Sequence, residues 1–228
     1  MMKLFSQKKL VLLAMFGAVS TGFIRAEETV VADVQETAPF EEVVLQKLIV
    51  AQDVVAQQEE AVRSQEITRS GCEPFTLESD NFENRGWMPE RLAYYGCNHS
   101  PALTWHNAPG CTETFVVIME DLNTPVGEWS HWVIYNIPGC LDSLSEDLCK
   151  EIRLFDGIRQ GVNDFGAVGY DGPAPASGKH TYFITIYALD TCLDFDCEIL
   201  PSRQTLRYAM EGHILDQATL IGYYETCD

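Results

Sequence analysis

The feature that most constrains the fold is the segment Gly161–Asp190, in which a loop rich in glycine, aspartate and proline runs directly into a strand pattern. Residues 181–189 read TYFITIYAL, an alternating run of β-branched and aromatic residues that is typical of a strand. His180 stands where the loop becomes the strand. Rigid β scaffolds commonly carry functional polar groups on such loops. The segment therefore predicts a β-rich domain with a loop-borne pocket.

Two further apolar runs, at residues 115–119 and 131–137, are equally short, and glycine and proline punctuate the chain between them. Short strands joined by turn residues predict an antiparallel β-sandwich. About 157 residues follow position 71, which is enough for one hydrophobic core. We therefore predict one mainly β domain over residues 72–228. A few peripheral helices are expected, and Ser202–Glu211 has the clearest helical pattern.

Residues 1–26 have the layout of a secretory signal peptide. Lys3, Lys8 and Lys9 precede the apolar run Leu10–Val19, and no acidic residue occurs before Glu27. The apolar stretch is shorter than the ~20 residues that span a bilayer, and an uncleaved membrane anchor is the alternative interpretation. We expect an exported protein, periplasmic or secreted.

Residues 27–71 differ in composition from the rest of the chain, with no glycine before Gly71 and no cysteine. The apolar residues after Pro39 follow a helical spacing, at Val44, Leu48, Ala51, Val55 and Val62. We predict an acidic helical arm from about residue 39 to residue 65. Three roles remain open for this arm: self-association through residues 39–65, docking on the domain, and a partly disordered spacer.

The charge of the chain limits the classes of molecule that it can bind. The formal net charge is −19. Residues 1–26 hold four of the 15 basic residues and none of the 34 acidic residues, so the remainder carries a net charge of −23. Nucleic acids and anionic membrane surfaces would repel such a chain. Any contact with a phospholipid must therefore come from a local pocket.

All eight cysteines lie after residue 71. An even number of cysteines behind a signal peptide predicts disulfides in an oxidising compartment, and the absence of C-x-x-C argues against zinc-ribbon and thioredoxin-like sites. Connectivity cannot be deduced from the sequence. All eight cysteines are candidates, and we expect four disulfides among them. The pairs that we consider are Cys140–Cys149, Cys192–Cys197 and Cys72–Cys227, and Cys97 and Cys111 are the two remaining candidates.

Several motifs occur in an order that belongs to one family. They are NHSPALTW at residues 98–105, DLNTPVGEWSHWVIYNIP at residues 121–138, the segment Gln160–Asp190, and MEGHIL at residues 210–215. Over roughly residues 72–228 the chain resembles the phosphatidylethanolamine-binding protein family, in its bacterial Raf-kinase-inhibitor-like branch. Several motifs in the same order make a far more specific signal than one isolated match.

The resemblance implies a large sheet packed on a smaller one and a pocket that binds anions such as phosphate. Carried over by motif, the ligand-binding residues would be Asp121, His131, Pro173, His180 and Tyr182. Imidazole and phenol groups can donate hydrogen bonds to an oxyanion, and a neighbouring carboxylate can orient a histidine. No metal and no cofactor are expected.

Two departures from the family pattern change the charge of this pocket. The family loop D-P-D-x-P reads Asp121-Leu122-Asn123-Thr124-Pro125 here, so the second acid is absent. The arginine of the family motif H-R-Y is Thr181. The first change removes a negative charge and the second removes a positive charge, so the two act in opposite directions on anion affinity.

The function that we predict is non-enzymatic binding of a small anion or phospholipid head group, with a protein target such as a protease as a further partner. One rival is a phosphoester hydrolase that uses His131 or His180 as acid–base groups with Asp121. Against it, the sequence contains neither G-x-S-x-G nor H-E-x-x-H. Another rival is a structural or interaction protein of the envelope. Both histidines could also be buried core residues, and Asp121 a turn former.

Overall fold

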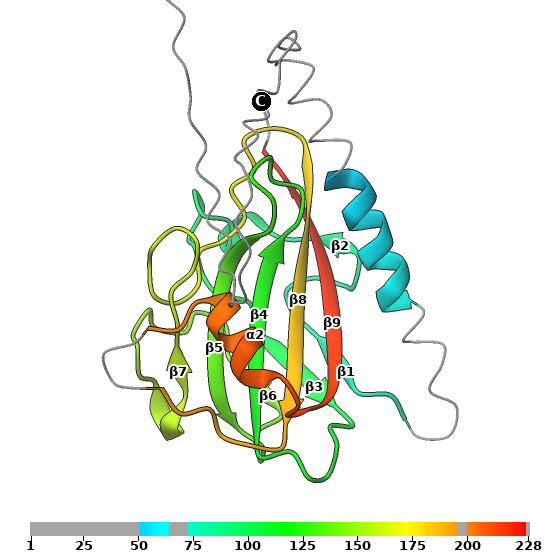
Figure 1. Ribbon diagram of the computed structural model, residues 1–228. Coiled ribbons are helices and arrows are strands. Elements are labelled where there is room, and N and C mark those ends of the chain that lie inside the picture. The colour runs from blue at the N-terminus through cyan, green and yellow to red at the C-terminus, as the bar shows by residue number, and fades with distance from the viewer. Residues whose placement is uncertain (1–50, 64–72, 196–199, 227–228) are drawn as a thin grey trace, which may run out of the picture. The chain divides into compact units, whose positions relative to one another are not determined.

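A computed structural model describes residues 51–63, 73–195 and 200–226 (Figure 1). A helix over residues 51–63 precedes the domain. The strands are β1 (Thr76–Glu78), β2 (Gly86–Trp87), β3 (Leu103–His106), β4 (Thr114–Asp121), β5 (Trp129–Pro138), β6 (Ser143–Leu144), β7 (Arg159–Gln160), β8 (Lys179–Leu189) and β9 (Ile214–Glu225). The helix α2 covers Arg203–Met210, and two short 3-10 helices are η1 (Glu90–Leu92) and η2 (Phe155–Gly157).

The strands form two sheets. The larger has the order β2-β9-β8-β4-β5-β7 and the smaller the order β1-β3-β6. All pairs are antiparallel except β2–β9, which is parallel. The prediction of a mainly β domain with two sheets and few helices is therefore confirmed.

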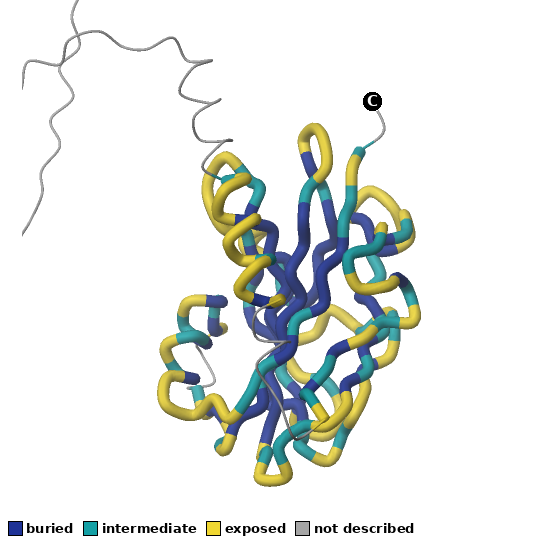
Figure 2. Tube along the Cα trace, turned by 90° about the vertical axis from the view of Figure 1, so that its right-hand side faces the viewer, coloured by how far each residue is buried: buried dark blue, intermediate teal, exposed yellow. Residues whose placement is uncertain are grey.

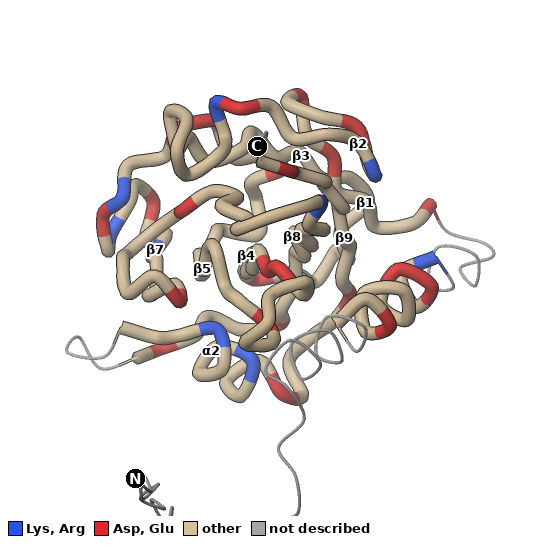
Figure 3. The backbone as a smooth tube through the Cα atoms, turned by 90° about the horizontal axis from the view of Figure 1, so that it is seen from above, with Lys and Arg blue, Asp and Glu red and all other residues tan. Residues whose placement is uncertain are grey.

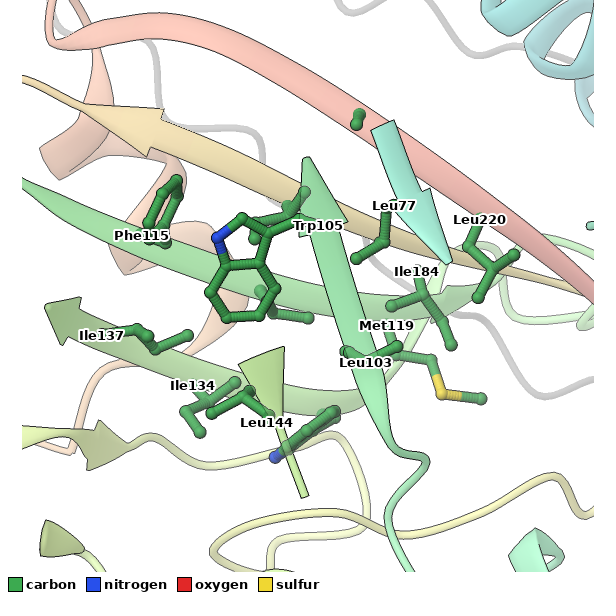
Figure 4. Close-up of a cluster of buried hydrophobic side chains, with 14 of the residues drawn as sticks. Leu77, Leu103, Trp105, Phe115, Met119, Ile134, Ile137, Leu144, Ile184 and Leu220 are labelled. Atoms are coloured by element: carbon green, nitrogen blue, oxygen red, sulfur yellow. The ribbon is translucent and has the colours of Figure 1, made fainter. Parts of the chain in front are cut away.

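One hydrophobic core joins the two sheets (Figure 4). Leu103 and Trp105 of β3 face Phe115, Met119 and other residues of the large sheet within this core. The indole Nε1 of Trp105 donates a hydrogen bond of 3.1 Å to the carbonyl of Leu141, so the polar atom of the buried ring is satisfied.

The run at residues 115–119 is apolar throughout because β4 is covered on both faces. All eight residues of the strand are buried. Phe115, Val117 and Met119 belong to the core between the sheets, whereas Val116 and Ile118 belong to a second cluster with Leu206 and other residues of α2. A strand that is buried on both faces reads as a continuous apolar run.

The predicted helix near residues 202–211 is confirmed as α2, and Ser202 caps it by accepting a hydrogen bond from the amide of Thr205. Salt bridges hold α2 on the outer face of the large sheet. Arg203 and Arg207 contact the buried Glu120 at 2.8 and 2.7 Å. Figure 3 shows basic positions along α2, on the side of the domain where β4 and β5 lie. Burial raises the pKa of Glu120, and the two arginines oppose that effect.

The helix over residues 51–63 lies against the outer face of the large sheet. Its buried residues Val55 and Val62 form one cluster with Leu122, Phe183 and Ile221, and Figure 2 shows the buried central strands and the more exposed helix. Docking on the domain is thus the observed role of this part of the arm. The first half of the arm, with Val44 and Leu48, lies outside the described residues, and self-association through residues 39–65 remains a prediction.

The predicted Cys140–Cys149 disulfide is wrong. Both thiols are free and exposed, as are those of the other described cysteines, Cys97, Cys111 and Cys192. The carbonyl of Cys149 is held by Gln160, whose partner in the sheet is Ile134, six residues before Cys140. The strand from Ile134 to its end at Pro138 spans about 13 Å before the turn that holds Cys140, whereas bridged cysteines have Cα atoms about 6 Å apart.

The predicted Cys192–Cys197 disulfide is wrong as well, because the thiol of Cys192 is free. The Cys72–Cys227 pair and the signal peptide are not tested by the structure. Cys72, Cys197 and Cys227 lie outside the described residues, and so does the segment 1–26. Among the residues described, no helix has the length and the apolar character needed to cross a membrane.

A bulge in β5 depends on Asn136. The register between β4 and β5 shifts between the pairs Phe115–Ile137 and Val117–Ile134. Asn136 lies within the shift, with a left-handed φ of 54°. Its side chain donates to the carbonyl of Leu193 at 2.7 Å and accepts from the amide of the same residue at 2.9 Å. Asparagine suits this position because it tolerates the left-handed region and satisfies both backbone groups.

We predict that Asn136→Ala lowers the free energy of unfolding by about 3 kcal/mol, from two lost hydrogen bonds and a strained φ. Asn136→Gly should lose about 1 kcal/mol less, because glycine adopts a positive φ without strain. Urea denaturation monitored by tryptophan fluorescence measures both values. An alanine variant as stable as the parent would contradict this explanation of the bulge.

Candidate functional site

The candidate site lies where three central strands of the large sheet meet at one end. Asp121, the last residue of β4, is paired with Trp129 at the start of β5 and with Tyr182 near the start of β8. Antiparallel pairing brings the end of one strand beside the start of its neighbours. Residues that lie up to 61 positions apart in the sequence therefore occupy one edge of the sheet.

A pocket of about 360 Å³ opens at this edge. Its walls come from the β4–β5 loop, the start of β5 and the loop that leads into β8. The lining residues are Asp121, Asn123, Thr124, Pro125, Trp129, His131, Phe165, Ala174, Pro175, Ala176, Ser177 and His180. Three of the five residues predicted as ligand-binding, Asp121, His131 and His180, thus share one pocket.

Asp121 and His180 form an ion-pair geometry inside the pocket. The Nδ1 atom of His180 lies 2.6 Å from Oδ2 of Asp121, and both side chains are largely buried. The other carboxylate oxygen, Oδ1, accepts a hydrogen bond of 2.8 Å from the amide of Asn123. Because Nδ1 is engaged by the carboxylate, the ring is oriented and Nε2 remains for a ligand.

His131 is held differently, by a backbone carbonyl. Its Nδ1 lies 2.7 Å from the carbonyl oxygen of Asp171, so Nδ1 donates the hydrogen bond. In the neutral ring, Nε2 then carries no hydrogen. The ring packs edge-on against Phe165 and Tyr182, with centroids 5.3 and 5.2 Å away. Burial lowers the pKa of His131, although the backbone hydrogen bonds and the charge of Asp121 oppose the shift. The imidazole is therefore neutral at neutral pH.

Asp171 organises the loop behind His131, and the sequence reasoning missed it. Its Oδ1 accepts hydrogen bonds from Asn98 at 2.9 Å and from Lys150 at 2.7 Å, and its Oδ2 accepts one from Asn163 at 2.9 Å. Burial alone would raise the pKa of Asp171, but the hydrogen bonds from Lys150, Asn98 and Asn163 outweigh it, so the pKa is lowered. The signal in the sequence was the position of Asn98 and Asp171 inside two family-like motifs.

The same loop is hydrogen-bonded to the free edge of β5. The amides of Gly161, Asp164 and Asp171 donate to the carbonyls of Val133, Ser130 and His131, each at 2.9 Å. The edge of β5 beside the pocket is thus covered by the residues that form the pocket wall.

Tyr182 and Pro173 do not line the pocket. Tyr182 is fully buried next to His131, and within the described part of the chain its hydroxyl has no hydrogen-bond partner. Burial and the nearby charge of Asp121 raise the pKa of this hydroxyl. The carbonyl of Pro173 accepts a hydrogen bond from the amide of Tyr94, and Pro175 lies in the pocket wall instead.

Asn123, one of the departures from the family pattern, joins the β4–β5 loop to the start of β8. Its side-chain oxygen accepts a hydrogen bond of 2.7 Å from the amide of Thr181, another departing position. Over residues 51–63, 73–195 and 200–226 there is no group of three or more histidine, cysteine, aspartate or glutamate residues that would hold a metal ion.

Comparisons with known proteins place this geometry in a family context. The family model described as phosphatidylethanolamine-binding protein matches residues 78–225. A protein of Methanothermobacter thermautotrophicus, named UPF0098 protein, is 45% identical over 148 residues, which are 65% of this chain and 97% of the relative. A UPF0098 protein of Aquifex aeolicus is 40% identical over 152 residues, covering 64% of this chain and 86% of the relative.

Two solved structures are similar as well. A phosphatidylethanolamine-binding protein homologue of Chlamydia trachomatis has a TM-score of 0.61 and 32% identity, and the match covers 67% of this chain and 98% of the other. YbcL of Escherichia coli, described as a new member of the mammalian family, has a TM-score of 0.63 and 28% identity. That match covers 68% of this chain and 100% of the other.

We predict that His131 makes the protein sensitive to acid. Because its pKa is lower in the folded state than in the unfolded state, the unfolded chain takes up the proton first as the pH falls below about 6.5. Between about pH 7.5 and pH 5.5 this residue should reduce the free energy of unfolding by at most about 1.4 kcal/mol.

The measurement is urea denaturation of the parent and of His131→Gln at both pH values. Other groups titrate alike in the two proteins, so the stability difference between them should shrink on acidification. A difference that stays constant would show that His131 is not buried as a neutral ring.

Proposed function

The chain belongs to the phosphatidylethanolamine-binding protein family, and from this premise we propose that the domain is a non-enzymatic binding module for a small anion or the anionic head group of a phospholipid. The observation that carries the proposal is the convergence of His131 and His180 on one pocket, with Asp121 orienting the second ring. Two imidazoles held in one pocket can, when protonated, both donate to an oxyanion.

The two histidines would contribute in different ways. The Nδ1–H of His180 donates to Asp121, so Nε2 of this ring can donate to an anion only when the ring is protonated on both nitrogens. His131 is neutral before binding, and a bound anion would favour its protonated form and raise its pKa. Binding of an anion should therefore be accompanied by uptake of a proton.

The size and walls of the pocket support a head group rather than a bare ion alone. Its volume of about 360 Å³ lies within the range of small-molecule pockets. Trp129, Phe165 and Pro175 provide apolar contacts beside the polar end. Asn123 stands where the family motif has a second acid, so the pocket has one carboxylate less to repel an anion.

We further propose that the protein is exported to the periplasm or beyond. The support is the charge and hydropathy pattern of residues 1–26. In that setting a protein target such as a protease is a more plausible partner than a cytosolic kinase. Cell fractionation with an antibody to the domain tests the location, and recovery of the protein in the cytosol at its full-length mass would refute export.

A phosphoester hydrolase is the second candidate function, and one observation favours it. A carboxylate–imidazole pair at 2.6 Å is the arrangement of a general base with its orienting group, and Ser177 and Thr124 lie in the same pocket. Incubation of the domain with 4-nitrophenyl phosphate decides between the two. Turnover that is lost in His180→Ala would make the protein an enzyme.

We predict that the domain binds inorganic phosphate and sulfate and that both bind more weakly as the pH rises from about 5.5 to about 8, because the protonated form of His131 that an anion favours is lost. Sulfate keeps its charge over this range, so its binding reports the protein groups alone. The double variant His131→Ala with His180→Ala should bind at least about a hundredfold more weakly, since two donors to an anion are removed.

Isothermal titration calorimetry measures affinity, and its repetition in buffers of different ionisation enthalpy counts the protons taken up. His213→Ala is a matched control, because His213 forms a similar pair with Asp190 at 2.8 Å on the exposed surface. If the double variant binds sulfate as tightly as the parent and the His213 control, the proposed pocket is not the anion site.

A further inference from the structure

The helix over residues 51–63 is an addition to the family domain. The family match begins at residue 78, after the helix has ended. The two solved relatives are covered over 98% and 100% of their lengths, whereas the matches cover 67% and 68% of this chain. The sequence that aligns with the relatives thus accounts for the sheets and the pocket but not for this helix.

The helix nevertheless packs on the domain through buried side chains. Val55 and Val62 are each 7% exposed and cluster with the buried Phe183 and Ile221. At the polar margin of this contact, Glu59 lies 3.5 Å from the hydroxyl of Tyr223 and 3.8 Å from Arg85. Apolar burial of this kind is the main source of stability for a docked helix.

The remaining member of the cluster is Leu122, which belongs to the pocket loop. The residue is 8% exposed and stands between two residues that line the pocket, Asp121 and Asn123. Asp121, the last residue of β4, lines the pocket, whereas Leu122, in the bend that follows the strand, packs in the cluster with the helix. The family motif has proline at this position, and leucine supplies the larger apolar side chain that the cluster uses.

The two neighbours of Leu122 in the chain are joined to the pocket by a short series of hydrogen bonds. The amide of Asn123 donates to Oδ1 of Asp121 at 2.8 Å, and the Asn123 side chain accepts from the amide of Thr181 at 2.7 Å. The carboxylate of Asp121 holds His180 through its other oxygen at 2.6 Å. A shift of the backbone at Leu122 would therefore change the position of Asp121 relative to His180.

We propose that the added helix is a positioning element of the anion site: it fixes Leu122 from the outer face of the sheet and thereby holds Asp121 and Asn123 in their binding geometry. The inference rests on the proposed function for its effect on affinity. Its structural half, that the helix orders the loop from Asp121 to Asn123, stands independently. A helix that merely covered apolar surface would contribute to stability and leave the pocket unchanged.

Two adjacent valines give a matched test. Val55 is buried in the cluster and Val54 is 42% exposed, so Val55→Glu should displace the helix while Val54→Glu should not. In the full chain, Val55→Glu should weaken binding of inorganic phosphate about five- to tenfold, in the range typical of coupling between separate sites. The conservative variant Val55→Ile should bind phosphate with the affinity of the parent.

Amide hydrogen exchange followed by NMR is the second readout, and it needs no ligand. The amides of Asn123 and Thr181 should exchange faster in Val55→Glu than in the parent, while amides in the centre of β4 and β8 should keep their protection. If Val55→Glu proves too unstable, Val55→Ala and Leu122→Ala create smaller defects in the same cluster and should show the same local pattern.

The outcomes separate the two proposals. Failure of the parent protein to bind phosphate would defeat the proposed function, and the exchange rates of Asn123 and Thr181 would still decide whether the helix orders the loop. Unchanged exchange and unchanged affinity in Val55→Glu, with the domain still folded, would overturn the positioning role. Equal effects of Val54→Glu and Val55→Glu would overturn it too, because the effect would then come from added charge.

Discussion

The antiparallel pairing of β4 with β8 is the constraint on which the remaining structure depends. The register runs without a break from Thr114–Leu189 to Asp121–Tyr182. It fixes which side chains of the two strands point between the sheets and which point outward. It also brings the end of β4 to the start of β8, where the pocket lies. A shift of one residue would exchange the faces of Glu120 and Asp121, and would place a salt-bridged carboxylate in the pocket.

The site is maintained by polar groups that are buried but satisfied. The carboxylate of Asp171 accepts three side-chain hydrogen bonds, and its backbone carbonyl accepts one from His131. One residue therefore fixes both the loop and the imidazole ring. Buried polar groups of this kind are costly unless every partner is present. Within the described part of the chain, the hydroxyls of Tyr182 and of Ser130 are the exceptions beside this site. A bound ligand or an ordered water is the natural partner for a buried hydroxyl next to a pocket.

The sequence predicted the fold class, the helix α2 and three residues that share the pocket, because those depend on local patterns and on motifs. It did not separate the pocket wall from the layer behind it. Tyr182 lies two residues after His180 in β8, but it is buried against His131 and does not line the pocket. In the loop before β8, Pro175 lines the pocket and Pro173 does not. The prediction of disulfides between cysteines close in sequence was wrong, because a short spacing in the sequence does not show whether the two loops that carry the cysteines lie close together in the fold. The stripe at Val55 and Val62 predicted a helix, but no periodicity states what a stripe packs on.

The loop that lies along β5 has a further consequence, for solubility. By donating to the carbonyls of Ser130, His131 and Val133, this loop occupies hydrogen-bonding groups that an exposed strand edge would offer to another chain. Opening of the loop would uncover a buried, aromatic-rich strand edge as well as the pocket. Changes that loosen Asp171 or its partners are therefore expected to promote edge-to-edge aggregation, and selection for a soluble protein would preserve the loop even if its ligand were lost.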